Sequence, residues 1–310
     1  MTLPKKHKRV PIHGVLLLDK PAGLSSAQAL AKAKWLLNAE KAGHTGTLDP
    51  FATGLLPLCF GEATKFAQDL LDADKTYEAT VQLGVTTTTG DTEGEVIESR
   101  LVNISADQIE AALEKFRGSV SQVPPMYSAL KRDGKPLYQY AREGIHLQRE
   151  ARPVHIHSLE LIEYAAPQLT LRVSCSKGTY VRVLGEDVGA ALGCGAHLSA
   201  LRRTGIAALE LSRALTLDAL TTLPQAERAA RLLPVDALLS KFPRVDLNHE
   251  LARRFQQGQR IALDRAEVAA PCEPGRVRVY DAQSALLGTA KIVDGTVLAP
   301  ERLLASSASH

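Results

Sequence analysis

The segment from Lys75 to Gly84 alternates apolar and polar residues without a break. Side chains on a β-strand point to opposite faces in turn, so this pattern predicts a half-buried antiparallel strand with Tyr77, Ala79, Val81 and Leu83 on one face. Further strands are predicted at 14–19, 55–60, 154–164 and 168–176, and helices at 25–38, 62–73 and 106–116. Helices and strands mix without strict βαβ alternation, which predicts an α+β fold around a largely antiparallel central sheet.

The chain has room for more than one domain, with 310 residues of which 45% are hydrophobic. Prolines, glycines, aromatics and cations crowd residues 121–152, which indicates a surface insertion rather than a layer of the sheet. A proline-flanked connector at 223–243 precedes a helical segment and three short strand patterns. We therefore predict a large domain over residues 1–240 and a small β-rich domain over residues 245–305.

Membrane and secretory classes are not indicated. No apolar run approaches the roughly 20 residues that a membrane span needs, and the first residues lack the apolar stretch of a secretory signal. We expect a cytoplasmic protein. The cysteines are scattered without metal-ligand spacing, so we expect buried thiols and neither zinc ligands nor disulfides at Cys59, Cys175, Cys194 and Cys272.

Charge is uneven although the formal net charge is only +3. Four cations form a basic N-terminal arm, Lys5, Lys6, Lys8 and Arg9. Between residues 131 and 152, six cations face three acids. Such clusters are commonly only solvated surface, so charge by itself does not decide for a nucleic-acid partner.

Three residues are candidates for chemistry, although each also has an ordinary structural explanation. Three glycines and an Asp-Pro pair restrict the loop 43–56, which could hold Asp49 in one orientation, but an isolated Asp-Pro usually only starts a turn. Arg182 falls in the first turn of a helix predicted to begin near Tyr180, where it could keep a buried carboxylate ionised or form a plain salt bridge. Tyr77 could equally be a core aromatic.

Five motifs, taken in order, favour the chemical interpretation: LLLDKPAGLSS, GHTGTLDPFATGLLPLCFGEATK, ADKTYEATVQLGVTTTTGDTEG, GTYVRVLGEDVG and HLSALRRTGIA. Together they resemble the bacterial tRNA pseudouridine-55 synthase family, the TruB-type pseudouridine synthases, from about Gly14 to Gly205. The tail resembles a small RNA-binding domain of the PUA type. Two positions depart from the commonest pattern, because Ala27 stands where many members have Asn and Val183 where Thr is frequent.

The resemblance implies a pseudouridine synthase fold and an isomerase that acts on uridine 55 in the T-loop of tRNA. The base is flipped out, the N1–C1′ bond is cleaved, the uracil rotates, and a C5–C1′ bond forms. Asp49 is implied as the catalytic carboxylate, either attacking C1′ or removing a sugar proton to give a glycal. Arg182 is implied as its ion-pair partner, and Tyr77 as the residue that stacks on the base and removes the C5 proton.

The resemblance also implies substrate-binding residues: His44 against the flipped-out RNA, Tyr180 and Leu201 in the base pocket, and Lys20 shaping it from the first strand. The insertion 121–152 is expected to grip the RNA, with binding that weakens as salt rises. The implied partner is the T-stem and T-loop of tRNA. No cofactor, metal, membrane, guide RNA or obligate protein partner is expected.

Three other functions are considered. A non-catalytic RNA-binding protein would have no need of Asp49, Tyr77 and Arg182 together. A glycosidase or nucleoside hydrolase would want two carboxylates flanking the bond, and only one convincing carboxylate motif is present. A guide-RNA-dependent pseudouridylase would share the core, but the insertion and the compact tail favour a stand-alone enzyme.

Overall fold

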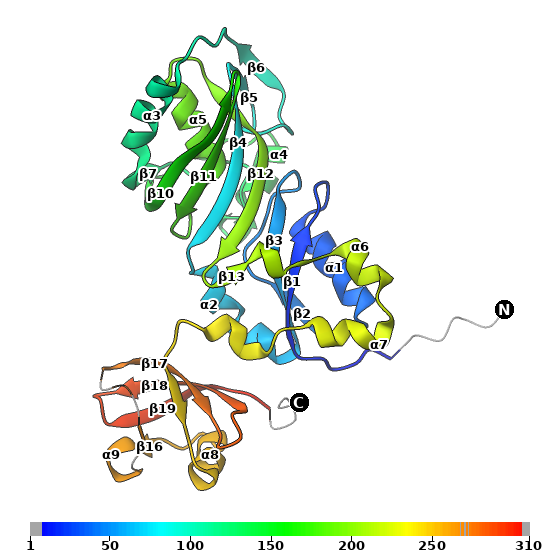
Figure 1. The fold of residues 1–310 in the computed structure, drawn as a ribbon, viewed down its shortest axis with the longest axis vertical. Helices are drawn as coiled ribbons and strands as arrows, with labels where there is room; N and C mark the ends of the chain where they lie inside the picture. The colour runs from blue at the N-terminus through cyan, green and yellow to red at the C-terminus, as the bar shows by residue number, and fades with distance from the viewer. Residues whose placement is uncertain (1–7, 267, 270, 272, 306–310) are drawn as a thin grey trace, which may run out of the picture.

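The computed structural model describes residues 8–266, 268–269, 271 and 273–305 (Figure 1). Its largest unit is a ten-stranded sheet. The strands of this sheet are β1 (Gly14–Lys20), β2 (Ala42–His44), β3 (Thr53–Phe60), β4 (Lys75–Leu83), β7 (Gly118–Gln122), β10 (Arg152–Ala165), β11 (Gln168–Cys175), β12 (Ala196–Ile206), β13 (Leu209–Glu210) and β14 (Leu215–Thr216).

The strand order is β14-β1-β3-β12-β4-β11-β10-β7, with β13 beside β12 and β2 beside β3. Two pairings, β1 with β14 and β12 with β3, are parallel. The other pairings are antiparallel. The predicted α+β class is therefore confirmed, and the sheet is mixed with antiparallel pairings predominating.

The α-helices of the described chain are short, and the last two lie with the C-terminal strands. The first begins where its capping box predicts, because the Ser25 side chain accepts from the Gln28 amide while the Gln28 side chain bonds back to the Ser25 amide. The α-helices are α1 (Ser26–Leu36), α2 (Ala67–Leu71), α3 (Ala106–Leu113), α4 (Leu137–Arg142), α5 (Val181–Ala191), α6 (Leu217–Thr222), α7 (Gln225–Arg228), α8 (His249–Gln256) and α9 (Leu263–Ala266). The 3-10 segments are η1 (Gly61–Phe66), η2 (Glu114–Phe116), η3 (Leu211–Arg213), η4 (Ala229–Arg231) and η5 (Val235–Leu239).

At β1 the large sheet is covered on both faces, which explains why this strand is almost uniformly apolar. Leu16 and Leu18 pack into the cluster that includes residues of α1, α3 and α5. Val15 and Leu17 pack into a second cluster with residues of η1, α2 and η5. A strand buried on both faces cannot show the alternation of a half-buried strand such as β4.

The centre of the sheet brings motifs from distant parts of the chain together. Antiparallel pairing sets Tyr77 of β4 opposite Arg203 of β12, and Ala79 opposite Leu201. Strand β12 also pairs with β3, where Arg203 lies opposite Gly54. A shift of one residue would turn these side chains to the other face, so the register itself positions them.

The C-terminal part forms a separate five-stranded sheet in the order β15-β17-β18-β19-β16. Its strands are β15 (Arg244–Asp246), β16 (Ile261–Ala262), β17 (Gly275–Tyr280), β18 (Leu286–Val293) and β19 (Val297–Leu303), and with α8 it encloses a hydrophobic cluster of its own. Asn248 caps α8 through its side chain, which accepts from the Leu251 amide at 3.0 Å. The domain boundaries at 240 and 245 stay predictions.

Two local predictions are wrong. The stretch TTTTGD, residues 86–91, whose composition predicts a polar loop, begins inside strand β5 (Val85–Thr87), which pairs with β6 (Val96–Ser99). The helix predicted over 62–73 is a 3-10 segment to Phe66 and α-helical only from Ala67 to Leu71.

Within the predicted insertion, β8 (Lys131–Arg132) and β9 (Lys135–Pro136) form a two-stranded hairpin that leads into α4. Cys59, Cys175 and Cys194 are buried free thiols, as expected, while Cys272 lies outside the described residues, as do Lys5 and Lys6 of the basic arm. In the part of the chain that the structure describes, no helix combines the length and apolar character that crossing a membrane requires.

Candidate active site

The loop between β2 and β3 is held from both sides of Asp49. The buried Ser26 hydroxyl, in the first turn of α1, accepts from the Leu48 amide at 2.8 Å and donates to the Leu48 carbonyl at 3.1 Å. On the other side, the Lys20 ammonium at the end of β1 donates to the Pro50 carbonyl at 3.3 Å. Strand β1 and helix α1 therefore fix the backbone that carries the carboxylate.

Asp49 meets Arg182 in an ion pair. Arg182 Nε lies 3.1 Å from Asp49 Oδ2, and Arg182 NH1 lies 3.3 Å from Asp91 Oδ2. The guanidinium also donates to the carbonyls of Thr89, at 3.1 Å, and Tyr127, at 2.5 Å. The side chains of Arg182 and Asp91 are 5% and 3% exposed, but that of Asp49 is 36% exposed. Arg182 is thus anchored by buried groups and presents Asp49 where a ligand can reach it.

Burial outweighs ion pairing in the ionisation of Asp49. Desolvation raises its pKa and the Asp91 charge adds to this, while Arg182 and Lys20 lower it, and the net result lies above the ordinary value. The positive charge of Arg182 therefore offsets the desolvation of Asp49 only in part. A carboxylate with a raised pKa is a stronger base once it is ionised.

A second buried guanidinium lies against Tyr77. Arg203 is 1% exposed and donates to the Leu55 carbonyl at 2.8 Å and to the Gly46 carbonyl at 3.1 Å. Burial raises the pKa of Tyr77, and Arg203 partly offsets that rise through its charge and a hydrogen bond to the hydroxyl. The close approach of β12 needs Gly54, with φ +99°, because a Cβ there would come within 2.3 Å of the Arg203 carbonyl oxygen.

Lys20 is fully buried at the end of β1, where its ammonium also donates to the Leu24 carbonyl at 2.6 Å and the Pro21 carbonyl at 2.9 Å. Burial lowers the pKa of Lys20 to about 8, although the Asp49 charge opposes this shift. The side chain therefore both holds the loop and supplies positive charge near the carboxylate.

Three more predicted site residues surround this centre. Burial raises the pKa of Tyr180, whose backbone exchanges hydrogen bonds with the Gln122 side chain at 3.0 and 3.3 Å. Burial and the nearby Arg203 lower the pKa of His44, so its ring favours the neutral form. Its Nδ1 is buried without a hydrogen-bond partner among the residues described. Leu201 is 7% exposed and packs in the same cluster as Tyr77.

The structure brings Asp49, Arg182 and Lys20 together, and the Asp49 charge also acts on the pKa of Tyr77 and Tyr180. The charge that acts on the pKa of His44 is that of Arg203, and Leu201 belongs to the hydrophobic cluster beside Tyr77.

Sequence analysis missed two residues of this centre, Asp91 and Arg203. Both lie inside the quoted motifs, as the acid of TTTTGDTEG and the second arginine of HLSALRRTGIA. The signal that could have found Arg203 was a charged residue within an otherwise apolar strand pattern.

Three family models match successive parts of the chain. "TruB family pseudouridylate synthase (N terminal domain)" matches residues 34–181, "tRNA pseudouridylate synthase B C-terminal domain" matches 182–240, and "Pseudouridine synthase II TruB, C-terminal" matches 243–304.

Among curated proteins, the chain is 62% identical to a tRNA pseudouridine synthase B of Burkholderia mallei, over 97% of this chain and 99% of that one. It is 57% identical to the protein of that name from Cupriavidus metallidurans, over 98% of each chain. Among solved structures, it resembles a chain of a Cbf5-Nop10-Gar1 complex with a TM-score of 0.74 and 27% identity, over 94% of this chain and 84% of that one. A chain of an H/ACA RNP bound to a substrate RNA containing 2′-deoxyuridine gives a TM-score of 0.73 and 25% identity, over 96% and 87%.

Proposed function

Because the chain belongs to the TruB family of pseudouridylate synthases, and is an isomerase of that class, we propose that it converts uridine 55 in the T-loop of tRNA to pseudouridine with Asp49 as its catalytic carboxylate. The observation that carries this proposal is the arrangement around Arg182. A guanidinium buried by Asp91 and two carbonyls holds one accessible carboxylate, Asp49, in a fixed place. Such preorganisation is what a reaction at a single carbon requires.

Asp49 acts on the sugar once the base is flipped out. It attacks C1′, or removes a sugar proton to give a glycal, and in either route the N1–C1′ bond breaks and the uracil leaves. The uracil rotates and C5 bonds to C1′, which displaces the Asp49 carboxylate in the first route or returns the sugar proton from Asp49 in the second. The C5 proton is then lost while N1 gains one. Arg182 favours the ionised form of Asp49 against the effect of burial, so the carboxylate stays available for either route.

Tyr77 is proposed to stack on the flipped uracil and remove the C5 proton. Its half-buried ring lies in the central strand, and burial holds the pKa of its hydroxyl above the ordinary range. Arg203 favours the phenolate by its positive charge, and its bonds to two backbone carbonyls fix that charge in place. Arg203 is therefore a positioning residue for Tyr77.

RNA binding is proposed to use three parts of the chain. Tyr180 and Leu201 line the base pocket, and the neutral His44 ring contacts the flipped nucleotide. These contacts offset the unstacking of the base, which costs about a few kcal/mol. Cations of the insertion 121–152, of which Arg132 and Arg142 are exposed, contact phosphates of the T-stem. The C-terminal sheet acts as a PUA-like RNA-binding domain.

The enzyme is proposed to work without a guide RNA or an obligate protein partner, in the cytoplasm where tRNA is found. Two similar structures come from complexes named for further components. The identity to curated tRNA pseudouridine synthases B, at 62%, is more than twice the 27% identity to the first of those complexes, and this favours the stand-alone enzyme.

Tritium release from tRNA labelled at uridine C5 tests the proposal directly. Wild-type protein in buffer alone should release tritium, whereas Asp49→Ala should release none and still retain tRNA on a filter. Asp107→Ala, which changes an exposed carboxylate of α3, is the matched control and should behave as wild type. Turnover by a clean Asp49→Ala preparation would refute the role of Asp49. Absence of release by the wild type would favour the RNA-binding alternative.

A further inference from the structure

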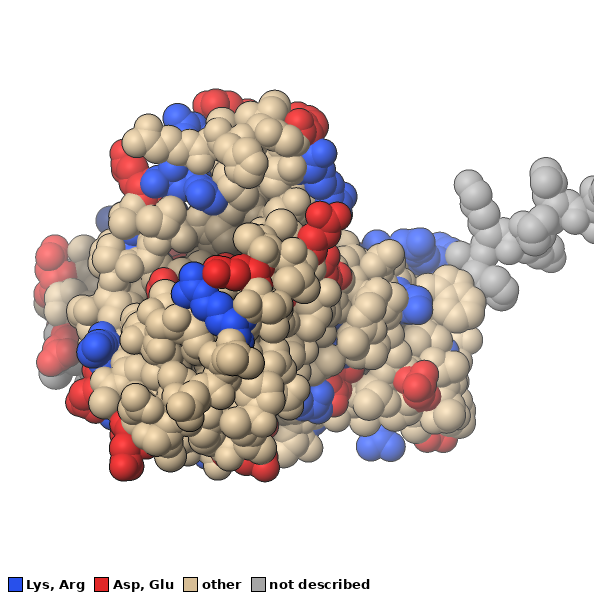
Figure 2. Space-filling view, turned by 90° about the horizontal axis from the view of Figure 1, so that it is seen from above, with Lys and Arg blue, Asp and Glu red and all other residues tan. Residues whose placement is uncertain are grey.

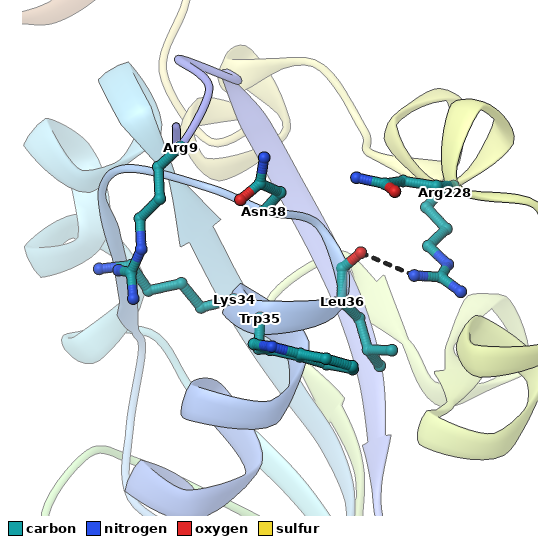
Figure 3. Close-up of a pocket in the computed structure, with 7 residues that line it drawn as sticks. Arg9, Lys34, Trp35, Leu36, Asn38 and Arg228 are labelled. Carbon is teal, nitrogen blue, oxygen red and sulfur yellow. Dashed lines mark hydrogen bonds between the residues drawn. The ribbon is translucent and has the colours of Figure 1, made fainter. Parts of the chain in front are cut away.

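Helix α1 ends in an exposed aromatic residue remote from the chemistry described above. Trp35 is the only tryptophan of the chain, and 77% of its surface is open to solvent. It lines a hollow of about 740 Å³ between the end of α1, the first described residues and α7 (Figure 3). A single exposed aromatic residue is common on protein surfaces, so the surroundings of this ring decide whether it belongs to an interaction site.

Positive charge surrounds the ring. Among the residues that the structure describes, the lining of the hollow holds Arg9, Lys34 and Arg228 and no acidic side chain. Figure 3 shows Arg9 and Arg228 on opposite sides of Trp35. In Figure 2, Lys and Arg side chains also gather where the grey N-terminal residues join the described chain. The charge of this hollow complements a polyanion.

One of these cations has a fixed side chain, and the backbone that carries another is tied down. Arg228 donates to the Leu36 carbonyl at 2.8 Å, as the dashed line in Figure 3 marks. The segment that carries Arg9 is tied to the end of α1, because the Asn38 side chain donates to the Lys8 carbonyl at 3.0 Å and the Val10 amide donates to the Asn38 carbonyl at 2.9 Å. A ligand would therefore find the Arg228 charge already in place, which lowers the entropy cost of binding.

A second hollow adjoins the first and extends towards the candidate active site. It measures about 820 Å³, shares Trp35 and Leu36 with the first, and extends to Lys20. The Lys20 ammonium reaches the Pro50 carbonyl next to Asp49. This second hollow gives a path between Lys20 and Trp35. Asp19, which pairs with Arg202, and Asp218 also line it, so among the described residues the lining without acids is confined to the hollow at Trp35.

We propose that Trp35 stacks on an unpaired base of the tRNA substrate outside its T-arm, while Arg9, Lys34 and Arg228 contact the flanking phosphates. This inference rests on the proposed function, since it adds a contact for the same substrate. Single-stranded RNA is commonly bound by an aromatic ring for the base together with cations for the backbone. The lining of the hollow at Trp35 holds three cations and no acid among the described residues, which favours single-stranded RNA over an apolar protein surface as its ligand.

The single tryptophan makes the test direct, because its fluorescence reports on this site alone. A full-length tRNA transcript should quench the emission, since a stacked base quenches indole. A T-arm hairpin should bind and react at Asp49 but leave the emission unchanged. Binding of full-length tRNA without quenching would overturn the proposal. If tRNA bound and quenched the emission but did not react, the proposed function would be refuted and the binding surface supported. If tRNA did not bind at all, both proposals would be refuted.

Variants test the energetic part. Trp35→Ala should weaken the affinity for full-length tRNA roughly tenfold or more, and leave affinity for the hairpin and the single-turnover rate unchanged. Leu101→Ala, which truncates another exposed apolar side chain, is the control. Lys34→Gln should reduce the salt dependence of tRNA binding by about one phosphate contact, whereas Lys115→Gln, an exposed lysine after α3, should not. Equal effects of Trp35→Ala on tRNA and hairpin would contradict a contact outside the T-arm.

Discussion

At the residue scale, two buried arginines set the electrostatics of the candidate site, Arg182 beside Asp49 and Arg203 beside Tyr77. Arg182 has two acidic partners, and of these only Asp49 is accessible. The buried partner, Asp91, raises the pKa of Asp49 by its own negative charge, so it has an electrostatic cost at the reacting group. Its benefit is that it fixes Arg182, and through Arg182 the orientation of Asp49.

Changing Asp91 to Asn should therefore reduce both stability and turnover. The substitution removes one partner of a buried ion pair but leaves Arg182 paired with Asp49, so we expect a loss of roughly 2–4 kcal/mol in the free energy of unfolding. Because a misplaced carboxylate costs rate, the single-turnover rate should fall on the order of 10- to 100-fold, with tRNA affinity nearly unchanged. Urea denaturation and rapid-quench tritium release measure the two effects.

A stability-matched control separates position from folding in this experiment. Leu159→Ala, in the buried face of β10, should cost a similar free energy, about 2–5 kcal/mol, but leave the single-turnover rate intact. If both variants lost the same rate, Asp91 would be no more than a folding residue.

Sequence could predict Asp49, Tyr77 and Arg182 only through the conjunction of motifs, because each has a common structural explanation. Asp91 lies in a stretch of threonines that predicts a polar loop, and nothing local indicates that its carboxylate is buried. Its partner is distant in sequence, and such pairs follow from the fold rather than from a local pattern.

At the element scale, periodic segments were predicted well and mixed ones poorly. Strand β4 and helix α1 follow from alternation and from a capping box, which are both local signals. Residues 61–66 carry helical spacing but form a 3-10 segment, because tight packing of Ala63 and Phe66 against β1 and β3 decides the winding there. Strand β5 pairs with β6 through backbone hydrogen bonds, and the run of threonines does not show an alternating pattern that would predict this pairing.

Helix α5 and the loop around Gly90 should give the protein a measurable pH dependence. A Cβ on Gly90 would lie 2.7 Å from the Glu186 carboxyl carbon, so this carboxyl packs directly against the loop that carries Asp91. Burial raises the pKa of Glu186 to about 6. The folded state thus binds this proton more tightly than the unfolded chain does, and the associated stability is present below pH 4.5 and lost as the pH rises through about 6.

Glu186→Gln should therefore stabilise the protein at pH 7.5, on the order of 1 kcal/mol, and much less at pH 4.5. Thermal unfolding at the two pH values measures the difference. Glu40→Gln, at an exposed position, is the control and should show no such change. A gain of equal size at both pH values would mean that packing rather than ionisation is responsible.

At the scale of the whole molecule, the two sheets are joined by specific contacts rather than by a free linker (Figure 1). The Lys65 ammonium donates to the Leu303 carbonyl at 2.9 Å, and the Tyr280 hydroxyl donates to Asp236 at 2.7 Å. Leu304 packs into the cluster on one face of the ten-stranded sheet. The sequence predicts two units from composition and strand patterns, but it could not predict this interface, because the contacts join residues more than 40 positions apart.

The ion pair of Arg276 with Asp69 provides the clearest test of that interface. Arg276 of β17 pairs with Asp69 of α2 and with Glu301, and the Asp69 side chain is only 10% exposed. Arg276→Gln would leave Asp69 buried without its partner, so we expect a loss on the order of 3 kcal/mol in the free energy of unfolding. Adding Asp69→Asn to that variant should restore more than half of the loss, because the uncompensated charge is then gone.

The same pair predicts a pH effect with a definite sign. Burial raises the pKa of Asp69 and Arg276 lowers it, so removing Arg276 should raise that pKa further. Protonation then favours the folded state, and the deficit of Arg276→Gln should shrink as the pH falls from 7.5 towards 5. Lys177→Gln, which removes an exposed pair with Asp72, should show no measurable loss at either pH. If neither a lower pH nor Asp69→Asn reduced the stability loss of Arg276→Gln, apolar packing alone would hold the two sheets together.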